Sequence, residues 1–377
     1  MKWAQLACQS PGGVAHIPDI RTVRSCVRAG RKGSPTRRDP GNPVREIYLT
    51  YLNRADVEAA ALTDAEILAT IEASLAMQGR GETVIEPRTH LEPRSGVAGH
   101  FNVLRGWIGG GLDVAGVKVI GDFVENYRQD LPSELGLLCL FDPRTGAPVA
   151  VLDASGITDI RTGAMTAVGA KYLARQDART LGHVGARGTA YWNVRLLDSL
   201  FDFETIRVHS RRPESREGFA RRLSRDLGKE VVATADWRSC VEGADIVVEA
   251  SRLTSPQPML LTDWIKPGAL VIPYGTMSAV ELSLTDIMSK IVVDDWGQCA
   301  TGKFGALRAH VEAGKLTQAV LHAELGQIVA GLRPGREDDE ETILFWHRGL
   351  SLSDIALGHA ILAKAASIGV GQRLRYA

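Results

Sequence analysis

Between residues 181 and 293, short apolar runs alternate with helix-like segments. The runs are nearly continuous in Val, Ile, Leu and Ala, as expected for strands that are buried on both faces of a sheet. They comprise Leu181–Val184, Thr205–His209, Glu230–Ala233, Asp245–Ala250, Ala269–Pro273 and Lys290–Val293. Because strands alternate with helices, the pattern predicts an α/β fold with a doubly wound parallel sheet of the Rossmann type.

Helices are predicted between and around these strands. Those between the strands are marked by Tyr191–Phe201, Ser215–Leu227 and Thr262–Ile265. Longer helical segments are predicted at Gly163–Ala174, Ala306–Ala330 and Glu340–Ala366.

The first part of the chain has a different pattern. Ile47–Leu52 is typical of a strand, and Thr63 is placed to cap a helix, with acidic residues in the first turn. Between residues 83 and 152, β-rich runs alternate with Gly and Pro turns, and Asp142–Gly146 has the composition of a hairpin turn. This part is therefore predicted to be α+β, with a largely antiparallel sheet.

Residues 1–45 crowd Gly, Pro, Ser and Arg together without hydrophobic periodicity, which predicts a disordered N-terminal extension. An organellar leader and a start site assigned too early are the alternatives. The 377 residues carry 44 basic and 44 acidic side chains, a balance that favours neither nucleic acid nor an anionic membrane as a partner. No apolar run approaches the roughly 20 residues of a membrane span.

The five cysteines are far apart and lack C-x-x-C spacing. This distribution predicts reduced thiols in a cytoplasmic protein and no metal site.

A glycine-rich turn follows the first apolar run of the parallel sheet. It consists of Gly185, Ala186, Arg187, Gly188, Thr189 and Ala190, where a dinucleotide turn has G-x-G-x-x-G/A. Arg187 stands at the second glycine, a position that is normally bare because the backbone approaches the phosphates there. The helix that follows would direct free N–H groups at a pyrophosphate. The turn predicts a dinucleotide site; the alternative is an ordinary strand-to-helix turn.

The next strand ends at Ser210, Arg211 and Arg212. An NAD site usually places an acid in this region to accept the ribose 2′-hydroxyl. A serine and two arginines favour a 2′-phosphate instead, so NADP(H) is predicted over NAD(H). The alternative is that the two arginines belong to a solvated strand end.

Three basic residues of the first part have the chemistry of a substrate site. Lys118 lies between two valines in a strand, and if both faces of the sheet are covered its pKa falls, which suits a proton donor. A surface lysine on an edge strand is the alternative. Arg88 and Arg161 could together form a fork for a substrate carboxylate.

Several segments together resemble the ornithine cyclodeaminase/mu-crystallin family. They include G-V-K-V-I-G-D-F-V-E-N, D-A-S-G-I-T-D-I-R-T-G-A, the glycine turn, D-I-V-V-E-A-S and E-L-G-Q-I-V-A-G-L-R-P-G-R. The resemblance spans about residues 47–370, and the I-T-D-I-R-T-G-A block is its most specific part.

The resemblance implies a homodimer that uses NAD(P)(H) on small amino or imino acids. Residues 161–337 would form the Rossmann domain, and residues 46–160 with 338–377 a substrate-binding and dimerisation domain built from both chain ends. The residue roles that it implies are substrate binding by Arg88, Lys118, Arg161 and Asn126, and cofactor binding by Arg161, Thr162 and Ser251.

Two departures from the cyclodeaminase pattern bear on function. The family's G-x-D-x-P-G-K-x-E-L stretch corresponds to Pro273–Leu282, P-Y-G-T-M-S-A-V-E-L, which lacks the aspartate and the lysine. The family's F-K-S-x-G has become F-W-H-R-G, in which His347 could donate a proton to an imine. A purely structural histidine is the alternative.

These departures favour simple hydride transfer over cyclodeamination, which needs more groups. We therefore predict an imino-acid reductase or amino-acid dehydrogenase, with Lys118 and His347 as catalytic residues. An ornithine cyclodeaminase and a non-catalytic nucleotide- or ligand-binding protein are the alternatives.

Overall fold

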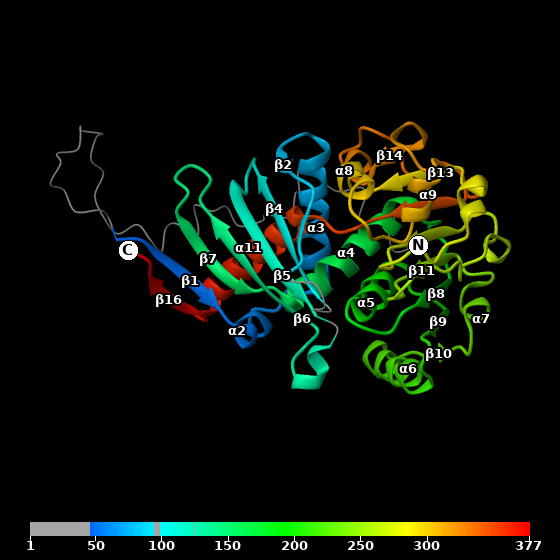
Figure 1. The fold of residues 1–377 in the computed structure, drawn as a ribbon, viewed down its shortest axis with the longest axis horizontal. Coiled ribbons are helices and arrows are strands. Elements are labelled where there is room, and N and C mark those ends of the chain that lie inside the picture. Colours follow the sequence, from blue (N-terminus) through cyan, green and yellow to red (C-terminus); the bar gives the residue numbers. More distant parts are fainter. Residues whose placement is uncertain (1–45, 94–98, 124) are drawn as a thin grey trace, which may run out of the picture.

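The computed structural model describes residues 46–93, 99–123 and 125–377. The predicted disordered extension, residues 1–45, lies outside this part. Two sheets of eight strands lie side by side and are linked by the long helix α4, Ser155–Leu173 (Figure 1). The predicted α/β fold, with a parallel sheet beside an α+β unit, is confirmed.

The first sheet has the strand order β16-β1-β7-β6-β5-β4-β2, with β3 also paired to β4. Its pairs are antiparallel except for the parallel pair β1–β7, so the predicted largely antiparallel sheet is confirmed. The strands are β1 (Tyr48–Leu52), β2 (Thr83–Ile85), β3 (Thr89–Leu91), β4 (His100–Ile108), β5 (Val114–Asp122), β6 (Glu134–Phe141), β7 (Pro148–Asp153) and β16 (Gln372–Arg375).

Helices α2 (Arg54–Ala59), α3 (Asp64–Gly79) and α11 (Ser351–Ile368) accompany this sheet, and α11 packs on β4, β5 and β6. The predicted cap at Thr63 is confirmed, because its hydroxyl accepts from the Glu66 backbone N–H at 3.2 Å. Glu66 in turn accepts from the Thr63 N–H at 2.7 Å. This capping box starts the helix at the predicted position.

The second sheet is entirely parallel, with the order β10-β9-β8-β11-β12-β15-β13-β14. The strands are β8 (Thr180–Val184), β9 (Thr205–His209), β10 (Val231–Ala233), β11 (Ile246–Glu249), β12 (Leu270–Pro273), β13 (Lys290–Val293), β14 (Ala323–Glu324) and β15 (Ile343–Trp346). All six predicted strands are therefore present.

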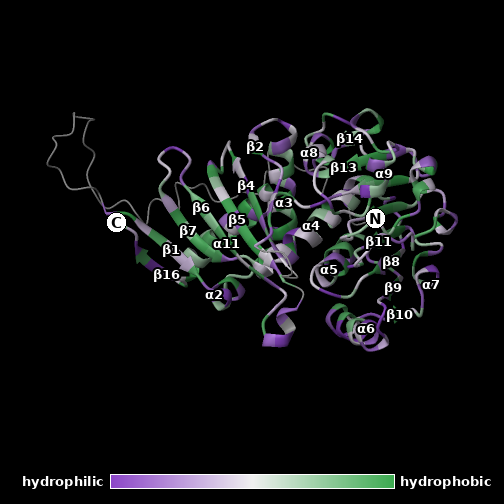
Figure 2. Cartoon of the chain, viewed as in Figure 1, coloured by the Kyte–Doolittle hydropathy of each residue, from purple (hydrophilic) through white to green (hydrophobic). Residues whose placement is uncertain are grey.

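The helices of this part include α5 (Ala190–Phe201), α6 (Pro213–Leu227), α7 (Trp237–Val241) and α8 (Trp296–Ala300). Figure 2 shows that the strands of the parallel sheet are largely hydrophobic, whereas the outer helix α6 is largely hydrophilic. Such a contrast is expected when helices cover strands that are buried on both faces.

The predicted helices at 306–330 and 340–366 are only partly correct. The first segment is divided into α9 (Arg308–Glu312), β14 and α10 (Leu325–Val329). In the second, Ile343–Trp346 is strand β15, inserted between β12 and β13, before α11 begins. A run of four apolar residues fits a buried strand as well as a buried helix. Along the chain, the border between the sheets thus lies after Trp346 rather than at residue 338.

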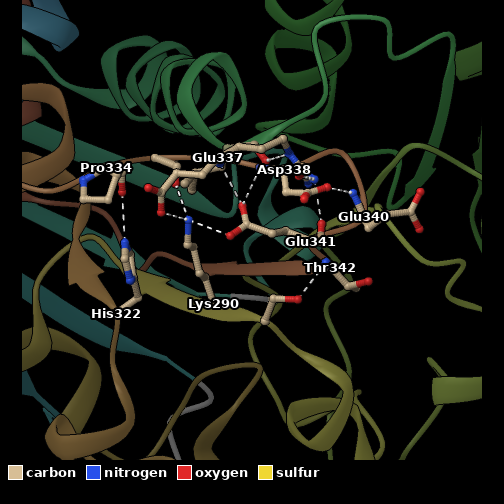
Figure 3. A network of polar contacts seen from close by, with 12 residues as sticks. Lys290, His322, Pro334, Glu337, Asp338, Glu340, Glu341 and Thr342 are labelled. Atoms are coloured by element: carbon tan, nitrogen blue, oxygen red, sulfur yellow. Dashed lines mark hydrogen bonds and ion pairs between the residues drawn. The ribbon is translucent and has the colours of Figure 1, made fainter.

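The segment that leads into β15 is fastened to β13 by Lys290, whose side chain is 8% exposed. Its ammonium donates to the Gly335 carbonyl and to Glu337, both at 2.8 Å, and pairs with Glu341 at 2.7 Å (Figure 3). Thr342 follows this anchor directly. The anchor thus helps to direct β15 into the sheet, and residues 347–349 emerge at its carboxyl edge.

In the part of the chain that the structure describes, no helix is long and apolar enough to cross a membrane.

Candidate active site

The strand order of the parallel sheet reverses between β8 and β11, because β9 and β10 lie on one side and β12 to β15 on the other. Ligands of such sheets bind beyond the carboxyl ends of the strands at this switch point. The glycine turn follows β8, and Ser251 follows β11, so both lie at the switch point. Segments 274–275 and 347–349 follow β12 and β15 at the same edge.

The glycine turn has a backbone that requires glycine at two positions. Gly185 has φ +116°, and a Cβ there would lie 2.7 Å from the Ala250 carbonyl oxygen. Gly188 has φ +51°, in the left-handed region. The side chain of Arg187 is exposed, so it does not fill the space that the turn encloses. Arg187 at the usual second-glycine position is therefore compatible with close backbone approach to a phosphate.

A buried polar network supports the turn from behind. The ring of His183 contacts the Gly185 carbonyl at 3.0 Å and the Asn193 amide at 3.1 Å. Tyr274 contacts both Asn193 and Thr189, the latter at 2.6 Å. Burial lowers the pKa of His183 to about 4, so its ring is neutral and can donate on one side while accepting on the other. The network holds the turn against strands β8 and β12.

Ser210, Arg211 and Arg212 follow β9, and the two arginines are exposed. The Ser210 carbonyl accepts from Arg216 at 3.3 Å. Ser251 donates its backbone N–H to the buried Glu249 at 2.7 Å. These segments place four of the predicted cofactor residues at one edge of the sheet, next to the turn, whereas Arg161 and Thr162 lie on α4.

The first sheet contributes Lys118, which lies on the face of β5 that α11 covers and is 1% exposed. Its ammonium donates to Asp354 at 2.7 Å and to the Thr158 hydroxyl at 3.0 Å. The guanidinium Nε of Arg161 donates to the same Asp354 oxygen at 3.0 Å. Residues from β5, α4 and α11 thus share one buried carboxylate. The alternative of a surface lysine on an edge strand is wrong.

Burial lowers the pKa of Lys118 to about 8, because the charged ammonium is desolvated and Arg161 is nearby. Asp354 acts in the opposite direction by pairing with the ammonium. A lysine with this pKa can both give and accept a proton near neutral pH.

Arg88 and Arg161 converge on the segment after β15. Arg88 donates to the carbonyls of Arg348 and Gly349, the latter at 2.9 Å. A Cβ at Gly349 would lie 1.7 Å from a terminal nitrogen of Arg161, so only glycine leaves room for that guanidinium. Burial, together with Arg348 and Arg161, lowers the pKa of Arg88 to about 9. Tertiary contacts therefore bring together the two arginines that were predicted to form a carboxylate fork.

The charges of this region do not cancel. Four basic groups gather around it, Arg88, Lys118, Arg161 and Arg348. The neighbouring buried acids are Asp354 and Asp294, and the latter accepts the backbone N–H groups of Arg348 and Gly349 at 2.9 and 2.8 Å. Asp159 also interacts with Arg161 and Lys118. Four positive charges thus face three acids, and the formal excess of one positive charge favours an anionic ligand.

His347 is buried beside this cluster. Its Nε2 lies 3.0 Å from the Thr166 hydroxyl, which itself donates to the Thr162 carbonyl at 3.2 Å, so Nε2 is the donor. The ring stacks on Tyr274 with centroids 4.6 Å apart. Burial and the charge of Arg161 lower the pKa of His347 to about 3. The ring is thus neutral at neutral pH, which argues against the predicted proton-donor role and for positioning of Tyr274.

Asn126 is separate from these residues in its contacts. It opens the short 3-10 helix η1, Asn126–Gln129, and its amide donates to the Pro132 carbonyl at 2.8 Å. Its side chain therefore closes its own loop, rather than contacting Lys118 or the arginines.

Sequence reasoning missed Asp354, Asp294 and Tyr274. Asp354 was detectable as the single acid in segment 350–363, which apart from His359 consists otherwise of apolar and small residues. Nothing in the sequence distinguished Asp294 from its neighbour Asp295. Among the described residues, no group of three or more His, Cys, Asp or Glu is placed to hold a metal ion.

Ion pairs connect the two sheets near this site. Arg252, just after β11, pairs with Asp122 at the end of β5 at 2.5 Å and with Glu134 at the start of β6 at 3.3 Å.

The parallel sheet has a glycine turn at its switch point and faces a buried cationic cluster on the second sheet. These features define a dinucleotide-binding oxidoreductase that acts on small anionic substrates.

Comparison with known proteins agrees with this class. The family model of the ornithine cyclodeaminase/mu-crystallin family matches residues 50–368, and the chain belongs to this family. The chain is 31% identical over 270 residues to a Δ1-pyrroline-2-carboxylate reductase of Bacillus cereus, covering 71% of this chain and 82% of the relative.

Two solved structures show the same architecture. The Thermococcus litoralis Δ1-pyrroline-2-carboxylate reductase, in complex with NADH and L-proline, is 28% identical with a TM-score of 0.79, covering 86% of this chain and 100% of the other. An archaeal alanine dehydrogenase dimer with bound NAD is 26% identical with a TM-score of 0.80, covering 88% and 100%.

Proposed function

We propose that this protein is an NAD(P)H-dependent reductase of a small imino acid, or an amino-acid dehydrogenase when it runs in the opposite direction. The observation that carries the proposal is the buried Lys118–Asp354–Arg161 cluster, with Arg88 beside it, at the carboxyl edge of a dinucleotide-type sheet. The named activities of the relatives, imino-acid reduction and alanine dehydrogenation, support it.

Imine reduction adds a hydride to carbon and a proton to nitrogen. The nicotinamide supplies the hydride when bound. Arg88 and Arg161 hold the substrate carboxylate, which neutralises the excess positive charge. The Lys118 ammonium lies near the substrate nitrogen and gives it the proton, and Asp354 keeps that ammonium in place. The stacked rings of His347 and Tyr274 lie between the substrate site and the cofactor turn.

Cyclodeamination of ornithine and non-catalytic ligand binding are less well supported. Tyr274 lies in the stretch that lacks the family's aspartate, and its hydroxyl contacts Thr189 and Asn193. That stretch therefore supports the cofactor turn. A protein that only binds ligands has no evident need for a buried lysine with a lowered pKa.

The function is tested by following absorbance at 340 nm with NADPH or NADH and a panel of imino acids, including Δ1-pyrroline-2-carboxylate. We expect cofactor oxidation that depends on the imino acid. Conversion of ornithine to proline without net cofactor turnover would instead establish the cyclodeaminase. Cofactor binding without turnover of any substrate would establish the binding protein.

We further propose that NADP(H) is preferred over NAD(H), because Arg211 and Arg212 are exposed beside the glycine turn. Replacing both arginines by serine should raise KM for NADPH about 10- to 100-fold, the range for hydrogen bonds to a charged group, and change KM for NADH little. Steady-state kinetics with both cofactors measure this, with the exposed Arg225→Ser in α6 as control. An unchanged ratio of the two KM values would refute the preference.

We also propose a homodimer that forms through the face of the first sheet opposite α11. On that face Val119, Leu135 and Leu137 are 39%, 43% and 49% exposed. Burying such a face favours association, and the archaeal alanine dehydrogenase is a dimer. Leu137→Asp should give a monomer in light scattering, while Leu282→Asp, at a leucine that is 42% exposed on the other part of the chain, should not. A monomeric wild type would contradict the proposal.

The cytoplasmic location remains a proposal. Cys139, Cys240 and Cys299 are free thiols, as is usual in a reducing compartment. Cell fractionation tests it.

A further inference from the structure

The carboxylate of Asp159 lies against the glycine turn and has no role in the chemistry described so far. Asp159 belongs to the first turns of α4, and its Oδ1 lies 3.2 Å from the position of a Cβ on Gly188. The residue is partly buried. Among the residues that the structure describes, its carboxylate has neither a hydrogen bond nor an ion pair.

The packing of two helices fixes this position. α4 packs on α5, and a Cβ at Gly163 would lie 2.5 Å from the Cβ of Trp192, so glycine is needed for this close approach. Asp159 precedes Gly163 by four residues, and Gly188 precedes Trp192 by four. Because residues four apart share a face of a helix, the contact of Asp159 with the turn continues the same line of contacts.

The neighbours of Asp159 on α4 belong to the substrate site. Thr158 accepts from Lys118 at 3.0 Å, and Arg161 donates to Asp354 at 3.0 Å. Asp159 therefore lies between the residues proposed to hold the substrate and the turn proposed to hold the pyrophosphate. In a bound dinucleotide, the ribose of the nicotinamide half connects these two places, because it links the pyrophosphate to the ring that meets the substrate.

A ribose carries the donors that an ionised carboxylate needs. The carboxylate only accepts hydrogen bonds, and the two adjacent hydroxyls of a ribose can donate to its two oxygens. Dinucleotide folds use an acid in this way for the adenosine ribose. In this chain the usual place of that acid holds Ser210, Arg211 and Arg212. The free acid is instead on the side of the turn that faces the substrate site.

Asp159 is mostly ionised at neutral pH. Desolvation raises its pKa to about 6, and nearby charges modify this value. Glu134 of β6 acts in the same direction, while three cations oppose it, Arg161 of α4, Arg54 of α2 and Lys118 of β5. From the parallel sheet, Tyr274 interacts with it and is uncharged, because burial raises the pKa of this phenol to well above neutral.

We propose that Asp159 binds the hydroxyl groups of the nicotinamide ribose and thereby positions the nicotinamide between the glycine turn and Lys118. This inference rests on the proposed function, because it needs a dinucleotide at the switch point. The anionic pyrophosphate lies close to the same carboxylate and repels it. The hydrogen bonds from the ribose hydroxyls contribute more than this repulsion costs, since bonds to a charged group are strong.

The test measures dissociation constants by calorimetry at pH 8 for NADPH, NADH, ADP-ribose and ADP. ADP-ribose keeps the second ribose without nicotinamide, and ADP lacks both. Asp159→Ala should raise Kd for the first three about 10- to 100-fold, the range for hydrogen bonds to a charged group, and change Kd for ADP less than about threefold. Asp159→Asn, which retains one acceptor oxygen, should lose less affinity.

The control variant is Asp263→Ala, at an exposed acid of the 3-10 helix Thr262–Trp264. Its dissociation constants should equal those of the wild type. Unchanged binding of ADP by the Asp159 variants also shows that they are folded.

The pH dependence of ADP-ribose binding separates recognition of the ribose from repulsion by the pyrophosphate. The hydroxyls need the ionised carboxylate, so Kd should be constant above pH 6 and rise below it, by at most about tenfold per pH unit. Asp159→Asn should not show this rise. Repulsion alone predicts the opposite sign, because protonation of the carboxylate would then tighten binding.

Three results would overturn the inference. The first is tighter binding of NAD(P)H by Asp159→Ala than by the wild type, and the second is an equal loss of affinity for ADP and ADP-ribose. The third is unchanged cofactor affinity with a raised KM for the amino acid, which would place the substrate nitrogen at Asp159. Binding of neither NADPH nor NADH by the wild type would instead refute the proposed function.

Discussion

Replacing Lys118 by methionine is expected to lower kcat/KM for imine reduction about 10³-fold, within the range for loss of a positioned proton donor. The lysine is buried between Asp354 and Thr158, and methionine fills a similar volume without a proton to give. Binding of NAD(P)H should change little, because the glycine turn and residues 210–212 lie on the other sheet. Initial rates at 340 nm and cofactor titration measure the two effects separately.

The matched control is Lys364→Met, since this lysine is 41% exposed at the surface of α11. Its rates should equal those of the wild type. A Lys118→Met variant that retains more than a third of wild-type activity would exclude the proton-donor role.

The dependence of the reaction rate on pH gives a second test of the role of Lys118 in proton transfer. The pKa of Lys118 is lowered to about 8, so the ammonium is present below pH 8 and is lost above it. Reduction, which needs the ammonium, should be constant below pH 8 and fall about tenfold per pH unit above it. Amino-acid oxidation, which needs the neutral amine, should rise through the same pH. The residual reductase activity of Lys118→Met should not fall above pH 8 in this way.

Replacing Asp354 by asparagine is expected to lower the free energy of unfolding by about 3–5 kcal/mol, the range for removal of one partner of a buried ion pair. Its carboxylate oxygen is shared by Lys118 and Arg161, and the substitution leaves both buried cations without their acid. Urea unfolding of the full chain measures the change.

The control for this variant is Asp286→Asn. That acid pairs with Lys315 at 2.7 Å but is 60% exposed, and exposed pairs contribute little. A carboxylate ligand should stabilise Asp354→Asn more than it stabilises the wild type, because the variant has a larger excess of positive charge. An unfolding free energy within 1 kcal/mol of the wild type would show that Asp354 does not balance the cluster.

The parallel sheet was predictable because its signals are local. Each strand is a short apolar run, and Gly185–Ala190 joins one such run to a helix, so neighbouring residues alone define the elements. Strand β15 was not predictable in the same way. Ile343–Trp346 forms a strand because it pairs with both β12 and β13 and because Lys290 binds the preceding segment. Both conditions involve residues that are distant in sequence.

The candidate site was likewise predictable only where its signals are local in the sequence. Arg88, Lys118 and Arg161 could be named from the sequence, because their residue types and the surrounding segments indicated a carboxylate site. Their shared acid, Asp354, was missed: it lies 236 residues beyond Lys118, and only the packing of α11 on the sheet brings the two together. His347 was predicted as a proton donor from its residue type, whereas burial beside Arg161 makes its ring neutral.

The two kinds of sheet, the glycine turn and the basic residues follow from periodicity and side-chain chemistry within short segments, so they could be read from the amino-acid order alone. Which charges meet, which of them are desolvated and which polar atoms are left without partners became known only from the folded chain. These properties depend on distance and burial, which residues far apart in sequence set jointly.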